Sequence, residues 1–226
     1  MTQAPARILL LGGTGFVGRH VCEKLTRMGS SMTVITRRAN QASAIQNLPR
    51  VTVIEGDVYN LEFLTQCMHK HDVVINLIAI LHGTPAAFEK AHVQLPQVIA
   101  QACQDSGVHR LIHISALGAS LTGPSEYQRS KARGEEIFKQ AGLELTLLQP
   151  SVIFGKEDKF LNLFAQLQSI TPIVPLAGAT TRFQAVWVED VANAIAQCVF
   201  NSDTAGKTYE LCGPEVFTLQ QLVQKS

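Results

Sequence analysis

The chain has 226 residues, of which 46% are hydrophobic and 16% charged, and its formal net charge is +1. This length and composition fit a globular α/β protein with a substantial core. The small net charge excludes the strongly basic surface that is typical of nucleic-acid-binding proteins. The five cysteines are scattered without a CxxC pair, which favours a reducing cytoplasm over a disulfide framework.

Neither end of the chain nor its interior predicts a targeting or membrane segment. We expect no signal peptide, because the residues before Arg7 are few and polar. The longest apolar run, residues 73–81, is interrupted by Asn76 and is too short to span a bilayer. The seven histidines lack metal-ligand spacing, so no metal site is expected.

Apolar runs alternate with amphipathic stretches over the first 150 residues. The expected strands are residues 7–11, 31–36, 51–55, 72–78, 108–115 and 145–149. The expected helices are residues 17–28, 42–47, 60–70, 85–106 and 125–141. Near-continuous apolar strands separated by helices predict a parallel sheet covered on both faces, with right-handed crossovers.

After Pro150 the pattern changes. An amphipathic piece at residues 160–168 is followed by a proline-containing loop, a strand at 185–188 and a helix at 189–200. A short strand at 209–211 and a helix beginning near Thr218 complete the chain. We interpret residues 1–150 as a dinucleotide-binding core and residues 151–226 as segments of a small substrate lobe. We expect this lobe to be incomplete, because the last helix stops in its first turns.

The first strand-to-helix turn contains GxxGxxG, with Gly12, Gly15 and Gly18. Gly12 is expected to make the tight turn, Gly15 to permit close approach of a ligand, and Gly18 to let the helix pack on the strand. The free N–H groups and the dipole of the following helix favour an anion. This placement predicts a dinucleotide site. The residues expected to hold the pyrophosphate are Gly12, Thr14, Gly15, Phe16 and Val17.

The end of the second strand favours NADP(H) over NAD(H). An NAD site usually has a carboxylate there for the ribose 2′-hydroxyl, whereas this strand ends in Arg37 and Arg38. Guanidinium groups bind a 2′-phosphate well, although the two arginines can also be a solvated strand end. Asp57 and Val58 follow the third strand as candidates for the adenine, and the alternative for Asp57 is a simple turn.

Tyr127 and Lys131 are four residues apart, which places them on one face of a helix. A phenol is a poor base at neutral pH, and a nearby ammonium lowers its pKa. The pair can exchange a proton with a carbonyl or alcohol while a nicotinamide exchanges hydride. Tyr127 and Lys131 are therefore the expected catalytic residues, against the alternative of a surface tyrosine with an unrelated lysine.

These motifs together resemble the short-chain dehydrogenase/reductase superfamily, in its extended and atypical branches of the NAD-dependent epimerase/dehydratase type. The segments that carry the resemblance are residues 12–18, 57–58, 76–79, 127–131, 150–155 and 186–192. Residues 115–119 and 127–135 look most like an atypical group that includes the dehydrogenase-like accessory subunit of respiratory complex I and its bacterial relatives.

The resemblance implies a Rossmann-type doubly wound parallel sheet, with ligand across the carboxyl ends of the strands. Lys131 would hold the nicotinamide ribose and tune Tyr127. The other residues implied on the ribose and nicotinamide side are Ile78, Ala79, Ser115, Pro150, Val152 and Ile153.

One departure from the family pattern leaves the function open. Leu117 stands where active members carry a Ser or Thr that bonds the substrate oxygen; Ser115 is one candidate substitute, or a simple strand-end cap. The first hypothesis is an oxidoreductase or epimerase that acts through Tyr127 on a small carbonyl or sugar-like substrate. The second is a non-catalytic NADP(H)-binding subunit or assembly factor of a larger complex, at the periphery of a membrane. A homodimer is a further option.

Overall fold

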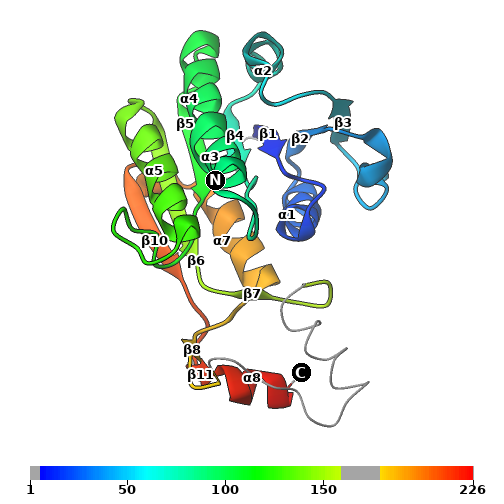
Figure 1. The fold of residues 1–226 in the computed structure, drawn as a ribbon. Helices are drawn as coiled ribbons and strands as arrows, with labels where there is room; N and C mark the ends of the chain where they lie inside the picture. The colour runs from blue at the N-terminus through cyan, green and yellow to red at the C-terminus, as the bar shows by residue number, and fades with distance from the viewer. Residues whose placement is uncertain (1–5, 159–178, 226) are drawn as a thin grey trace.

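The computed structural model describes residues 6–158 and 179–225. The amphipathic piece expected at residues 160–168 and the proline-containing loop after it lie outside the described residues. The body of the molecule is a seven-stranded sheet in which every neighbouring pair is parallel (Figure 1). In spatial order its strands are β10 (Lys207–Leu211), β6 (Glu144–Pro150), β5 (Arg110–Ile114), β4 (Val73–Asn76), β1 (Arg7–Leu11), β2 (Ser31–Thr36) and β3 (Val51–Glu55).

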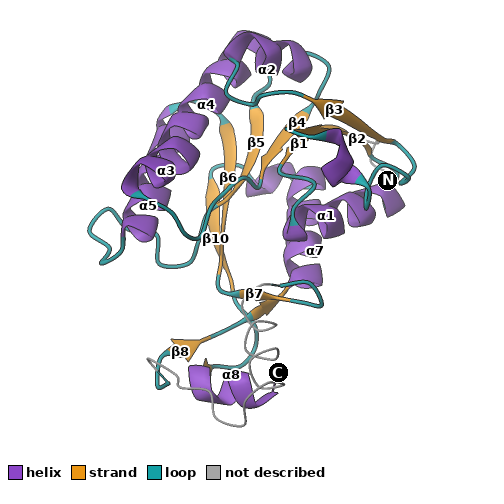
Figure 2. Cartoon of the chain, turned by 45° about the vertical axis from the view of Figure 1, so that its right-hand side comes forward, coloured by secondary structure: helices purple, strands orange, loops and turns teal. Residues whose placement is uncertain are grey.

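Helices cover both faces of this sheet (Figure 2). One layer contains α1 (Phe16–Arg27) and α7 (Val188–Phe200), and the other contains α2 (Leu61–Met68), α4 (Leu95–Ser106) and α5 (Glu126–Gln140). Alternate residues of β1 supply the two cores, with Ile8 and Leu10 on the α1 side and Leu9 and Leu11 on the α2 side. The expected doubly wound α/β fold of Rossmann type is therefore confirmed.

The bounds of β1, β2 and β3 match the sequence prediction residue for residue. The helix expected at residues 42–47 is wrong: a single 3-10 turn, η1 (Ala39–Ala42), stands before a run of turns. Ala42 and Ile45 are buried there, but the segment has too few apolar residues to bury the face of a longer helix.

The helix expected at residues 85–106 is interrupted. The structure has α3 (Pro85–Glu89), a π-helical turn η2 (Lys90–Gln94) and α4. Pro96, in the first turn of α4, has no N–H to donate to the carbonyl of His92 four residues earlier, and its ring crowds that carbonyl. The backbone widens at this point, and Leu95 N–H bonds the carbonyl of Lys90 instead.

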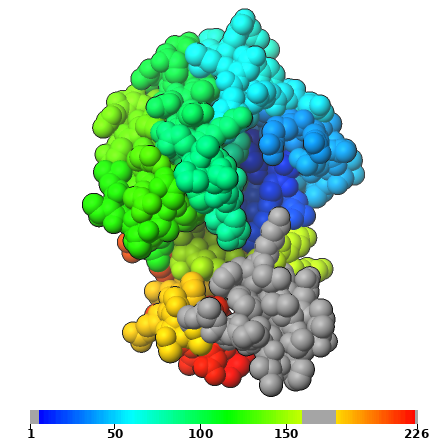
Figure 3. Space-filling model, viewed as in Figure 1, coloured from blue at the N-terminus to red at the C-terminus, as the bar shows by residue number. Residues whose placement is uncertain are grey.

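Beyond residue 150 the chain contributes both to the main body and to a lobe at the end of the sheet where β6 and β10 finish. In the lobe β7 (Ile153–Phe154) pairs with β9 (Val186–Trp187), and β8 (Arg182–Phe183) pairs with β11 (Phe217–Thr218). Figure 3 shows the yellow and red segments of this lobe, with α8 (Leu219–Lys225) in red, below the blue-to-green body. Since α7 and β10 complete the main body, the lobe comprises only part of residues 151–226; the domain division at residue 150 stays a prediction. Among the described residues no helix is both long and apolar enough to cross a membrane.

Arg110 ties the main sheet to the end of α7. Its buried guanidinium donates to the carbonyls of Glu144 at 2.6 Å and Cys198 at 2.8 Å, and to the hydroxyl of Thr204 at 2.7 Å. Burial lowers the pKa of Arg110 because it disfavours the charged form. The three acceptors offset part of this desolvation cost. Thr146 adds a second link by donating to the carbonyl of Thr204 at 2.8 Å.

We predict that Arg110→Met lowers the free energy of unfolding by about 2–4 kcal/mol, because two buried acceptors and one part-buried acceptor lose their donor. Urea denaturation followed by circular dichroism measures the change. Arg7→Met is the matched control, since Arg7 pairs with Asp72 in an exposed position and should matter far less. Equal losses in the two variants would contradict the role given to Arg110.

Candidate functional site

The glycine turn between β1 and α1 has the geometry that a pyrophosphate requires. Gly12 has a φ of 85°, which favours glycine. A Cβ on Gly18 would collide with the carbonyl oxygen of Gly12, so α1 begins directly against the turn. A Cβ on Gly15 would meet only that same oxygen, at 3.3 Å, so the space before the helix stays open. The first turn of α1 has neither a side-chain cap nor an acidic residue, and its N–H groups remain available to an anion.

The ends of β2 and β3 form the side expected to bind adenosine. Arg37 and Arg38 are exposed directly after β2, and neither guanidinium makes a hydrogen bond or ion pair that involves another described residue. Asp57 accepts from the N–H of Tyr59 at 3.0 Å, so its carboxylate does form a turn; its contact with adenine stays a prediction. Val58 is buried in the core, which limits its side chain to a supporting position.

Ile78 and Ala79 follow β4 and lie beside the glycine turn. A Cβ on Gly12 would be 3.2 Å from Ile78, which shows how closely the two segments approach. Asn76, at the end of β4, accepts from the N–H of Ile78 at 3.1 Å and lies 3.2 Å from Nδ1 of His113. The buried amide thus fixes the start of this loop.

Lys131 is anchored on α5 at the end of β5. Only 2% of it is exposed, and its Nζ donates to the carbonyl of Ile114 at 2.8 Å. Burial lowers the pKa of Lys131 to about 8, and the charge of Glu135 opposes this shift. The ammonium is therefore still largely charged at neutral pH, which is the form that could donate to ribose hydroxyls.

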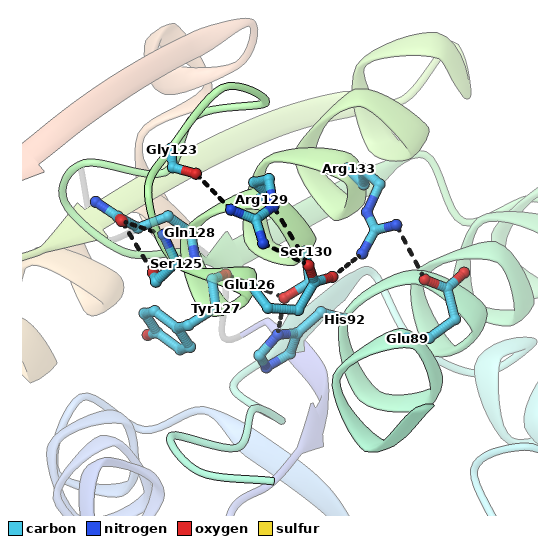
Figure 4. A network of polar contacts seen from close by, with 10 residues as sticks. All are labelled: Glu89, His92, Gly123, Ser125, Glu126, Tyr127, Gln128, Arg129, Ser130 and Arg133. Atoms are coloured by element: carbon cyan, nitrogen blue, oxygen red, sulfur yellow. Dashed lines mark hydrogen bonds and ion pairs between the residues drawn. The ribbon is translucent and has the colours of Figure 1, made fainter. Parts of the chain in front are cut away.

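Tyr127 lies one turn earlier, close behind the Ser125 cap of α5. Figure 4 shows its ring beside His92, and the ring centroids are 5.7 Å apart. Burial raises the pKa of Tyr127. The expectation that Lys131 would lower this pKa is wrong here, because the ammonium is directed to the Ile114 carbonyl rather than paired with the phenol. Among the described residues the Tyr127 hydroxyl has no hydrogen-bond partner.

Ser115 and Leu117 follow β5 in the same region. Ser115 is 5% exposed, and its buried hydroxyl finds no hydrogen-bond partner within the described ranges. Burying a hydroxyl without a hydrogen-bond partner costs free energy of folding, unless a ligand or a water molecule bonds to it. Leu117 presents an apolar side chain and uses its N–H to bond the carbonyl of Pro150 at 2.9 Å. Its side chain cannot bond a substrate oxygen, as the sequence predicted.

The predicted residues therefore come together at one edge of the sheet, because parallel strands all end on the same side. Pro150 ends β6, and Val152 accepts from the N–H of Val186 at 2.9 Å where the lobe begins. The orphaned hydroxyl of Ser115 and the open space before Gly15 both fit a bound dinucleotide. Among residues 6–158 and 179–225 no group of three His, Cys, Asp or Glu side chains is placed to hold a metal ion.

Sequence reasoning missed His92 and Ser130, which are both buried beside Tyr127. Nδ1 of His92 lies 2.9 Å from the hydroxyl of Ser130, and Nε2 accepts from the N–H of Ile80 at 3.1 Å. The available signal was Pro96, which stands four residues after His92 and breaks the helix there.

Comparison with known proteins places this geometry in a family. A family model described as NAD(P)H-binding matches residues 12–202. NADH dehydrogenase (ubiquinone) 1 alpha subcomplex subunit 9, mitochondrial, of Mus musculus is 36% identical over 223 residues, which cover 95% of this chain and 59% of the relative. Ceramide reductase of Caulobacter vibrioides is 29% identical over 193 residues, 84% of this chain and 60% of the relative. The chain thus spans about three-fifths of the length of these curated relatives.

Among solved structures, a dTDP-glucose 4,6-dehydratase from Streptomyces venezuelae, crystallised with NAD bound, superposes with a TM-score of 0.86. It is 21% identical, and the match covers 97% of this chain and 79% of that one. This likeness supports the fold alone. The family model, which matches most of the chain, shows that the chain belongs to the NAD(P)H-binding family.

Proposed function

We propose that this chain binds NADP(H) and reduces the carbonyl group of a small or sugar-like substrate, with Tyr127 as the proton donor. The observation that carries the cofactor choice is the pair of exposed guanidinium groups, Arg37 and Arg38, directly after β2. They lie at the same edge of the sheet as the glycine turn. A dinucleotide whose pyrophosphate is held by that turn would place its 2′-phosphate near them.

Each residue has a distinct part in this function. The nicotinamide, when bound, supplies hydride. Lys131 and Ser115 would bind the nicotinamide ribose, since Lys131 holds a buried charge and Ser115 a buried hydroxyl that has no partner among the described residues. Tyr127 stays protonated at neutral pH because burial raises its pKa, so its hydroxyl can donate to a carbonyl oxygen. A neutral phenol favours reduction over the reverse oxidation, which needs a base.

A second candidate is a non-catalytic NADP(H)-holding subunit or assembly factor of a larger assembly at a membrane surface. Leu117 favours it, because the hydrogen bond that would orient a substrate oxygen is missing at that position. The mouse relative, a subunit of NADH dehydrogenase by name, supports the same interpretation. In this case the cofactor would be held permanently and Tyr127 would have no turnover to support.

We predict that Arg37→Ser combined with Arg38→Ser weakens NADPH binding roughly tenfold or more, because the 2′-phosphate loses its cationic partners. NADH binding should stay unchanged. Fluorescence titration with both nucleotides measures the effect. Arg50→Ser, at the opposite edge of the sheet just before β3, is the matched control. Equal weakening of NADH would contradict the 2′-phosphate assignment.

We predict that Tyr127→Phe lowers the rate of NADPH oxidation by about a hundredfold or more with any carbonyl substrate that the wild type reduces, because proton donation is lost. NADPH affinity should remain within a few-fold. Tyr59→Phe is the control, since its hydroxyl bonds the backbone carbonyl of Lys90 and not a group on α5. An NADPH chase separates the two candidates: release in well under a second supports the reductase, and release over minutes supports the holding subunit.

We predict that Lys131→Met raises the free energy of unfolding at pH 7 by up to about 3 kcal/mol while it weakens NADPH binding. The folded pKa of about 8 lies below the usual 10.5, so the unfolded chain binds more protons between these values. Wild-type stability should therefore rise as the pH increases from 8 to 10.5, and the variant should lack this rise. Urea denaturation at several pH values tests both statements; a less stable variant at pH 7 would refute them.

A further inference from the structure

The π-helical turn η2 places His92 between the loop that follows β4 and the first turns of α5. We propose that His92 is a positioning residue that couples the loop at residues 78–80 to the first turns of α5, which carry Tyr127. The inference rests on the proposed function where it concerns the nucleotide, since residues 78–80 are expected on the nicotinamide side. The contacts that support the coupling are present in the structure without a ligand.

Two backbone features hold His92 in this place. Pro96 opens the helix into the π-turn, because it offers no N–H to the His92 carbonyl. Gly134 of α5 lies directly against that carbonyl oxygen, and a Cβ at Gly134 would collide with it. The turn is therefore packed against α5, which leaves no room for the carbonyl to move toward it.

The hydrogen bonds fix the tautomer of His92. The N–H of Ile80 can only donate, so Nε2 of His92 must accept it, at 3.1 Å. The ring proton is then on Nδ1, which donates to the hydroxyl of Ser130 at 2.9 Å. Ser130 in turn donates to the carbonyl of Tyr127 at 3.0 Å. One neutral ring thus links the loop to the residue that bears the phenol.

The surroundings keep the imidazole ring of His92 uncharged and fixed in position. His92 is 3% exposed, and the rings of Phe88 and Tyr127 lie at centroid distances of 5.6 Å and 5.7 Å. Burial, reinforced by the charge of Lys131, lowers the pKa of His92 to about 4. Nε2 therefore remains an acceptor at neutral pH.

An ion-pair cluster supports the same junction from outside. Figure 4 shows Arg133 of α5 between Glu126 and Glu89, at 2.6 Å and 3.3 Å. Glu89 ends α3, immediately before the π-turn. The Arg133–Glu89 pair fastens α5 to the helix that leads into His92, while the Arg133–Glu126 pair lies within α5 and holds the arginine in place. The loop, the turn and the start of α5 thus form one connected unit.

The binding test compares His92→Phe with the wild type. The variant keeps a ring but loses both hydrogen bonds, and we expect NADPH affinity to fall about tenfold. Affinity for adenosine 2′,5′-bisphosphate, which lacks the nicotinamide half, should change less than twofold. His71→Phe is the matched control, since both nitrogens of His71 are also bonded, to the carbonyl of Cys67 and the hydroxyl of Thr33. It lies at the opposite edge of the sheet and should change neither affinity. Equal weakening of both ligands by His92→Phe would overturn the proposal.

Amide hydrogen exchange without nucleotide separates this inference from the proposed function. In His92→Phe we expect faster exchange both at residues 78–81 and in the first turns of α5. Ser130→Ala breaks only the second link, so it should leave Ile80 protected. Faster exchange confined to residues 88–96 would overturn the coupling. If the wild type binds neither nucleotide, the proposed function fails, and the exchange result still decides whether His92 couples the two segments.

Discussion

The lack of a side chain at Gly18 is the steric constraint on which the site depends. Because a Cβ there would strike the carbonyl of Gly12, only glycine lets α1 start directly against the end of β1. This contact fixes the helix N-terminus beside the carboxyl ends of the parallel strands, where Arg37 follows β2 and Ile78 follows β4. Every other site residue is placed relative to that point by the register of the sheet.

Several polar side chains are buried at the edge of the sheet where the parallel strands end. Asn76, His113, Lys131 and Ser115 are all buried at or beside the ends of β4 and β5. Apolar residues of similar volume would pack there at lower desolvation cost. Buried polar residues of this kind can serve a ligand, and both candidate functions need a bound dinucleotide. The two candidates differ in whether Tyr127 then transfers a proton and in how long the dinucleotide stays bound.

The fold and much of the site were readable from the sequence because they follow local rules. Strand bounds followed from continuous apolar runs, and strand ends converge on one edge whenever strands are parallel. The raised pKa of Tyr127 and the junction at His92 were not readable, because they depend on contacts between segments far apart in the chain, such as Lys131 with Ile114. Pro96 was visible, but its effect on His92 depends on Gly134 of another helix. The ligand roles of the site residues stay predictions.

The position of β10 has a consequence for the order in which the molecule can assemble. This strand completes the sheet beside β6, and α7 covers α1, although both come after residue 185. The nucleotide-binding half is thus not finished when its glycine turn, its arginines and its Tyr127–Lys131 pair have been synthesised. Until residue 204 has left the ribosome, Arg110 lacks two of its three acceptors, and until residue 211 has left it, β6 has an open edge. The nascent chain would depend on α7 to cover the first helix and on β10 to close the edge of β6.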